Sequence, residues 1–361
     1  MNKIKIIFIT IVCLAILSSC SSVTRSSLAD VPSEVNQTLD DNLVVNAKVN
    51  FPIDIKNDIY KYKARFFIAN SEKIYDELFI NKNVTTKREN PSEDETNSTN
   101  HYYLSDDGCS LICGGASVTF STPFSTKIFT SFHERYSYGF LASDGLYNAD
   151  LFLEKKDFSF LTAEDAADKV KTILTDWDIE LYSEIDTYYI DYKNSNEQYT
   201  KLSDSLTNKN NYSWSEDDNC YYFRLYQSVD NIPVANIVHG NIDDGSAISE
   251  NNIQVVYSKD GIQYLNCEFL YSIDEKSKEK VELISLDEAL ETVKNKYNNI
   301  IIFSEIDITN IDFSYVSVRN SKNDNDFKLV PAWVFELHQN DEEQDNCEYI
   351  IVNAETGEEI V

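Results

Sequence analysis

Cysteine and histidine side chains are the groups in this sequence best suited to nucleophilic or metal chemistry. The chain has seven cysteines and four histidines, the latter being His101, His133, His239 and His338. No histidine belongs to an H-E-x-x-H motif. A cysteine nucleophile needs a histidine base, and the local candidates are Cys109 or Cys113 with His101 or His133. Such pairs arise freely by composition, so we expect no catalytic residue, no cofactor and no metal site among them.

Carboxylates are abundant, with 61 Asp and Glu residues, but their spacing singles out no site. The segment Asn241-Ile242-Asp243-Asp244-Gly245 places glycine at the fifth position, whereas an EF-hand loop needs it at the sixth. The acidic stretches at 324–326 and 341–345 are interpreted as solvated hairpin loops. A weakly held divalent cation remains an alternative. A glycosidase needs two catalytic carboxylates, and among so many acids the sequence singles out no such pair.

Cys20 is the cysteine whose surroundings predict a definite chemical fate. Lys3 and Lys5 precede an apolar run from Ile6 to Leu17, which two serines join to Cys20. A membrane-spanning helix takes about 20 residues, so this shorter run is typical of a signal peptide. The alternative is an ordinary secretory peptide with a chance cysteine.

The stretch Leu17-Ser18-Ser19-Cys20 resembles the lipobox of bacterial surface lipoproteins of the Gram-positive type. The resemblance implies that a diacylglycerol thioether forms on Cys20, that residues 1–19 are removed, and that the new amino terminus is acylated. Two or more acyl chains give stable anchoring, whereas one chain binds only marginally. We therefore expect a lipid-anchored protein on the outer face of the cell membrane.

The composition describes an acidic, folded chain. A net charge of −30 repels phosphate backbones and anionic lipids, which argues against nucleic-acid binding. The acid excess is interpreted as solvation of an extracellular surface, with a divalent cation or a basic partner as alternatives. With 42% hydrophobic and 12% aromatic residues the chain can bury a substantial core. It has nine glycines and no phosphate-binding loop motif.

Five cysteines follow Cys20, and their odd number leaves at least one thiol outside any set of disulfides. Disulfides are permitted outside the cytoplasm. We nevertheless favour buried thiols for all five, which are Cys109, Cys113, Cys220, Cys267 and Cys347.

The first part of the folded chain is predicted to be mostly β. Residues 20–37 are Ser-rich and are interpreted as a flexible tether, and residues 38–155 as a mostly-β domain with an exposed loop at 81–100. Polar and apolar residues alternate in strand-like segments. These segments are 60–66, 117–120, 128–132 and 147–153. Asp107-Gly108 and Asp144-Gly145 are typical of hairpin turns.

An internal repeat organises the rest of the chain. Amphipathic helices are expected after Thr162 and after Ser285, each a hydroxyl N-cap followed three residues later by an acid. The phrase Ser-Glu-Ile-Asp then recurs at 183–186 and 304–307, and predicted strands follow in both copies. Trp177 and Trp333 lie on apolar faces and are expected in the core. Trp214 lies in a polar insertion and is expected at the surface.

One helix followed by antiparallel strands, twice, resembles the PepSY-like repeats of Gram-positive surface lipoproteins. The residues that carry the resemblance are 330–335 with 351–360 in the second copy, and Tyr222-Phe223 with Ile232-Pro233-Val234 in the first. It implies an α+β fold in which a mostly-β N-terminal domain precedes repeat 1 (156–274) and repeat 2 (275–361). Relatives of this type are associated with peptidase inhibition or regulation at the cell envelope.

We therefore expect a non-enzymatic binding or interaction module that regulates an envelope protein such as a peptidase. The alternative is an extracytoplasmic hydrolase acting on cell-wall or peptide substrates. A Cys–His pair within hydrogen-bond reach, or converging carboxylates in a cleft, would favour the enzyme. A solute-binding receptor is disfavoured because the alternating βαβ pattern of such two-lobed folds is missing.

Overall fold

The computed structural model describes residues 31–52, 58–91, 98–132, 152–203, 213–240, 248, 251–298, 304–320, 325–341 and 344–361. The expected signal peptide at 1–19, Cys20 and the first part of the expected tether lie outside these residues. Strand β1 begins at Glu34, within the segment 20–37 that was expected to be a flexible tether.

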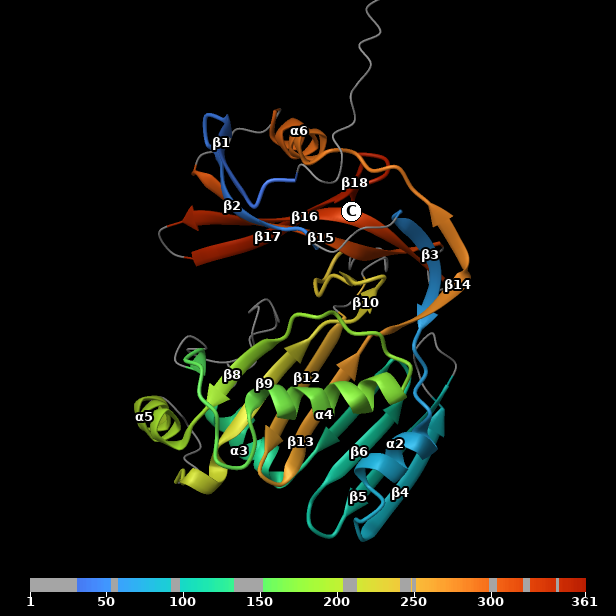
Figure 1. Ribbon diagram of the computed structural model, residues 1–361, viewed down its shortest axis with the longest axis vertical. Coiled ribbons are helices and arrows are strands. Elements are labelled where there is room, and N and C mark those ends of the chain that lie inside the picture. The colour runs from blue at the N-terminus through green and yellow to red at the C-terminus, as the bar shows by residue number, and fades with distance from the viewer. Residues whose placement is uncertain are drawn as a thin grey trace, which may run out of the picture.

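Two eight-stranded sheets form the framework of the described chain (Figure 1). Sheet A contains β1 (Glu34–Asp40), β2 (Leu43–Asn50), β3 (Tyr60–Phe66), β14 (Tyr271–Lys280), β15 (Ile306–Arg319), β16 (Phe327–Asp341), β17 (Gln344–Asn353) and β18 (Glu359–Ile360). Sheet B contains β4 (Val84–Pro91), β5 (Thr99–Ser105), β6 (Ser110–Gly114), β7 (Ser117–Ser121), β8 (Asp186–Ile190), β9 (Cys220–Leu225), β12 (Asn252–Ser258) and β13 (Gly261–Glu268). A hairpin of β10 (Ser228–Val229) and β11 (Ile232–Pro233) lies between the sheets.

Sheet A runs in the order β1-β2-β15-β16-β17-β18, and β3 joins β14 to one end of β16. Its pairs are antiparallel except for β2 and β15, which run parallel. Sheet B runs in the order β4-β5-β6-β7-β13-β12-β9-β8 and its pairs are antiparallel. The central strands of both sheets therefore come from distant parts of the sequence.

Helices cover one face of sheet A and both faces of sheet B. They are α2 (Ser71–Leu78), α3 (Pro123–Phe132), α4 (Ala163–Asp176), α5 (Tyr192–Ser203), the 3₁₀ turn η3 (Glu216–Asp218) and α6 (Leu286–Tyr297). Helix α6 packs on sheet A through Leu286, Ala289 and Val293, and α4 packs on sheet B through Ala166 and Val170. Helix α3 lies on the opposite face of sheet B from α4.

The two helix starts predicted from the sequence are confirmed. The Thr162 side chain accepts a hydrogen bond from the Asp165 backbone N–H at the start of α4. Ser285 and Glu288 form a reciprocal capping box at the start of α6. Each cap satisfies backbone N–H groups that the first helical turn leaves without partners.

Large aromatic side chains fill the cores, and two of the three tryptophans lie where they were expected. Trp177 is 4% and Trp333 1% exposed. Trp214 is 5% exposed, so its expected place at the surface is wrong. It packs in the core beneath α3, where the Lys127 ammonium lies 4.3 Å from its ring centroid and meets Asp218 at 2.8 Å.

The expected α+β fold, a mostly-β domain followed by two helix-plus-sheet repeats, is wrong. The molecule is mostly β, and its sheets are shared between the N-terminal segment and the repeat regions. Strands β1–β3 complete sheet A, whereas β4–β7 complete sheet B. A repeat alone would leave the edges of β15 and β13 without hydrogen-bond partners, which β2 and β7 supply.

Several local predictions are confirmed and two are wrong. Strands occur at 60–66 and 117–121, and Gly108, with φ of +82°, turns the β5–β6 hairpin. Residues 128–132 belong to helix α3 rather than a strand. The expected loop at 81–100 contains the exposed strand β4 at the edge of sheet B. Segment 147–151 and the turn at 144–145 lie outside the described residues.

Among the described residues, no helix has both the length and the apolar character needed to cross a membrane.

Candidate functional site on the polar face of sheet A

Sheet A has one face closed by α6 and an opposite face that carries polar side chains. In β2 the residues alternate, so that Leu43, Val45, Ala47 and Val49 are buried beneath α6. The intervening residues, together with those of β15, β16 and β17, form what we call the polar face. Its members are Asn46, Lys48, Asn50, Asp307, Asn310, Asp312, Glu336, His338, Cys347 and Tyr349. In Figure 1 this face is turned toward the half of the molecule that contains sheet B.

The segment after β11 covers the apolar end of the same face. Ile237 packs there with Val316, Val334 and Ile351. His239, one of the four histidines of the chain, is anchored here by a 2.7 Å hydrogen bond between Nε2 and the Ser317 carbonyl oxygen. Burial lowers the pKa of His239, so the imidazole is neutral and structural.

Asp312 is held at the centre of the polar face by two amides. The Asn50 Nδ2 donates to Asp312 Oδ1 at 2.7 Å, and the Asn310 Nδ2 donates to Asp312 Oδ2 at 2.9 Å. A register shift between Ile308 and Asn310 places Asn310 and Asp312 on this face. Burial raises the pKa of Asp312 despite these donors.

A cluster of three different ligand types lies beside Asp312. His338 and Cys347 are direct partners across the β16–β17 ladder, and Glu336 pairs with Tyr349 one row away. The His338 Nε2 and Glu336 Oε1 atoms are 2.8 Å apart. One ligand atom from each of Glu336, His338 and Cys347 lies within 4.8 Å of the others. The side chains of Glu336 and His338 are 28% and 26% exposed, so solvent reaches the cluster.

This arrangement can donate a carboxylate oxygen, an imidazole nitrogen and a thiol sulfur to one ion. Asp307, the partner of His338 on the other side of β16, adds a further carboxylate nearby. Asp307 accepts a 3.2 Å hydrogen bond from Asn46 Nδ2. The polar face thus combines negative charge with amide and imidazole groups that form hydrogen bonds.

A concave feature lies at the end of α4, apart from the polar face. A hollow of about 530 Å³ is lined by Lys171, Thr175, Asp178, Ile179, Glu180, Leu181, Tyr182 and Ser183. Burial raises the pKa of Glu180, which accepts hydrogen bonds from Asn231 N–H and Ser228 Oγ. The lining contains neither a cysteine nor a histidine, so the hollow offers no nucleophile–base pair of the kind sought in the sequence.

The sequence candidates Cys113 and His101 are brought together by the register of β5 and β6. They are direct cross-strand partners. Cys113 is 0% exposed, and burial raises its pKa to about 12. A thiol with that pKa is protonated at neutral pH, and the thiolate is the reactive form. The pair therefore does not form an activated nucleophile. His133 lies outside the described residues.

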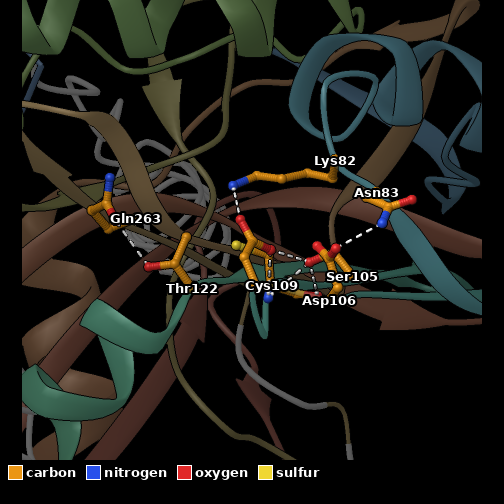
Figure 2. A network of polar contacts seen from close by, with 8 residues as sticks. Lys82, Asn83, Ser105, Asp106, Cys109, Thr122 and Gln263 are labelled. Carbon is orange, nitrogen blue, oxygen red and sulfur yellow. Dashed lines mark hydrogen bonds and ion pairs between the residues drawn. The ribbon is translucent and has the colours of Figure 1, made fainter.

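Cys109 belongs to a structural turn rather than to a reactive site. Figure 2 shows Lys82, Ser105 and Cys109 gathered at the β5–β6 hairpin. The Cys109 backbone N–H donates to Ser105 Oγ at 3.0 Å, and Lys82 Nζ pairs with Asp107 at 2.8 Å. Burial raises the pKa of the Cys109 thiol.

The remaining cysteines divide between core and surface. Cys220 and Cys267 are buried, and burial raises the pKa of both thiols. The expectation of buried free thiols thus holds for Cys109, Cys113, Cys220 and Cys267. Cys347 is half-buried rather than buried. The calcium-like segment at 241–245 lies outside the described residues.

The cluster of Glu336, His338 and Cys347 was not predicted, although the sequence contains a signal for it. Glu336 and His338 are two residues apart in a strand and so share a face. The β16–β17 ladder extends to Asp341 and Gln344, within the acidic stretch interpreted as a loop, and its register pairs position 338 with 347. The pairing of 338 with 347 follows from the register of β16 against β17, which neither strand shows by itself.

No family model matches the chain, and no curated protein matches it. The fold is similar to that of an uncharacterized protein from Eubacterium rectale ATCC 33656, with a TM-score of 0.70 and 18% identity. That match covers 91% of this chain and 94% of the other. The Bacillus megaterium YpeB C-terminal domain matches with a TM-score of 0.27 and 12% identity, over 80% of this chain and 92% of that one. The first similarity establishes a shared fold and the second carries no argument.

Proposed function

We propose that this chain is a lipid-anchored binding protein of the outer face of the cell membrane, and that the polar face of sheet A binds a basic segment of another envelope protein. The supporting observation is the charge of that face. Its described part holds the carboxylates of Asp307, Asp312 and Glu336 and one ammonium group, that of Lys48. A net charge of −30 extends the negative field around it and steers basic partners toward the molecule.

The partly exposed surface of the polar face favours binding over catalysis. A hydrolase needs an activated nucleophile and donors aimed at a developing oxyanion. His338 and Cys347 stand on a sheet whose β16 strand is paired on both sides, and ladder hydrogen bonds keep backbone N–H groups in the plane of the sheet. The described amides on this face, those of Asn46, Asn50 and Asn310, donate to Asp307 and Asp312. The hydrolase alternative therefore gains a Cys–His neighbour, but no backbone N–H group of the described ladder is aimed out of the sheet beside it.

The tether supplies the membrane attachment in this proposal. The lipobox-like Leu17-Ser18-Ser19-Cys20 would carry the acyl chains. Replacing Cys20 by alanine is expected to move the protein from the membrane fraction to the soluble fraction of the cell envelope. Retention of C20A in washed membranes would contradict lipid anchoring.

Site-specific photocrosslinking in intact cells tests the binding surface. A photoreactive amino acid at Lys48, which is exposed on the polar face, is expected to capture an envelope protein, with a peptidase among the candidates. The matched control position is Glu348, an exposed residue of β17 on the side of sheet A that α6 covers. Mass spectrometry of the adduct identifies the cross-linked segment.

The proposal predicts that the captured segment is rich in lysine or arginine and that crosslinking at Lys48 falls when Asp307 and Glu336 are both replaced by their amides. Equal capture from positions 48 and 348, or capture of an acidic segment, would refute the polar face as the binding surface.

A further inference from the structure

We propose that Glu336, His338 and Cys347 form a binding site for a transition-metal ion, with Zn²⁺ as the ion that the donor set fits best. This inference goes beyond the proposed function, because metal binding requires no partner protein and is measured on the isolated chain.

The ladder between β16 and β17 fixes the three donors relative to one another. His338 and Cys347 are direct cross-strand partners, and Glu336 is two residues from His338 on the same face. Their ligand atoms lie within 4.8 Å of one another. Tetrahedral Zn²⁺ with bonds of about 2.0–2.3 Å sets its ligand atoms about 3.5 Å apart. The strands hold the three side chains close enough that the ligand atoms need to approach by little more than about 1 Å for a tetrahedral site.

The chemistry of the donors selects the ion. Thiolate and imidazole groups favour Zn²⁺ and related first-row metals, whereas Ca²⁺ and Mg²⁺ prefer oxygen ligands alone. On binding, the Cys347 S–H bond breaks, the sulfur bonds to the metal and the proton leaves to solvent. The ion also takes the place of the proton that lies between His338 Nε2 and Glu336 Oε1, which are 2.8 Å apart. That proton is lost to solvent from Nε2, and the neutral imidazole then carries its one proton on Nδ1.

The surrounding charge favours a cation at this position. One thiolate and one carboxylate neutralise a divalent ion, and Asp307 and Asp312 add further negative charge on the same face. The half-exposed side chains of Glu336 and His338 leave an entry path from solvent. Three protein ligands leave a fourth tetrahedral position for water or for a group from a binding partner.

Cobalt(II) provides the test, because a thiolate bound to it gives a charge-transfer absorption in the near ultraviolet. We expect the full-length chain, purified in detergent under reducing conditions, to develop this band at one equivalent of Co²⁺ and to lose it when Zn²⁺ displaces the cobalt. The C347S variant should lack the band, and H338A should bind Co²⁺ at least tenfold more weakly. E336Q should weaken binding to a smaller degree.

The control is C109S, which removes a thiol that has no histidine beside it among its described contacts and should keep the band. Far-ultraviolet circular dichroism establishes that each variant is folded. A band that persists in both C347S and H338A, or the absence of stoichiometric Co²⁺ and Zn²⁺ binding by the wild-type chain, overturns the proposal. Neither result would bear on photocrosslinking at Lys48, so the two proposals fail separately.

Discussion

Tyr62 of β3 donates a hydrogen bond from its hydroxyl to Asp230, which lies in the turn between β10 and β11. Asp230 and Asn231 both have positive φ, at 51° and 60°, as a two-residue hairpin loop requires. Tyr62 is 2% exposed and belongs to the core of sheet A. The bond therefore ties the hairpin between the two sheets to sheet A.

The Tyr62→Phe variant tests this tie. It removes the hydroxyl while the ring stays in the core, and the exposed Asp230 carboxylate can be rehydrated. We expect the free energy of unfolding, measured by urea titration, to fall by about 1 kcal/mol. Tyr102→Phe, which removes a hydroxyl from a half-buried ring of β5, is the comparison and should change it by less than about 0.5 kcal/mol. Equal effects of the two variants would show that the bond to Asp230 adds no stability.

The cap of α6 allows a second prediction. Ser285→Ala removes the acceptor of the Glu288 N–H and breaks the reciprocal capping box. The free energy of unfolding is expected to fall by about 1 kcal/mol. Glu291→Ala, at an exposed position of the same helix, keeps the cap and should change the stability by a few tenths of a kcal/mol. A loss as large for E291A as for S285A would contradict the capping role.

The sequence located helix starts well, because a cap is a local interaction between residues three apart. Thr162 with Asp165 and Ser285 with Glu288 needed no knowledge of the rest of the chain. Sheet membership depended on contacts far apart in sequence. The parallel pairing of β2 with β15 joins residues about 260 positions apart, and no local pattern encodes it.

The candidate site was missed for the same reason. Cys109, Cys113 and His101 lie close in sequence, but both thiols are buried, and the Cys109 backbone N–H donates to Ser105 in the β5–β6 hairpin. His338 and Cys347 became neighbours only once the β16–β17 register was known. Trp214 was misplaced because its polar sequence neighbours gave no sign that α3 would cover it.

Asp312 makes the stability of the folded chain depend on pH. Burial raises its pKa in the folded state, so the folded protein holds the proton more tightly than the unfolded chain does. The stabilisation that Asp312 contributes is fully present below the pKa of an unfolded aspartate, about 3.9, and is lost as the pH rises through the pKa in the folded state. As the pH is lowered from 7 to 4, the unfolding free energy of the wild type should therefore increase relative to that of the Asp312→Asn variant. A difference that is constant over this range would contradict a raised pKa.

Thiol labelling separates the cysteines by burial and by pKa. Cys113, Cys220 and Cys267 are buried, and the pKa of each is raised, to about 12 for Cys113, so few of these thiols are ionised at pH 8. Cys347 is half-buried on the polar face. We expect iodoacetamide to modify Cys347 first in the folded protein, as read by peptide mass spectrometry, and the three buried cysteines only after denaturation in urea.

Adding Zn²⁺ beforehand should slow the reaction of Cys347 if the metal site forms, while the C109S substitution should leave the reaction rate of Cys347 unchanged. Labelling of Cys113 or Cys267 at the rate of Cys347 would show that sheet B opens readily around its core thiols.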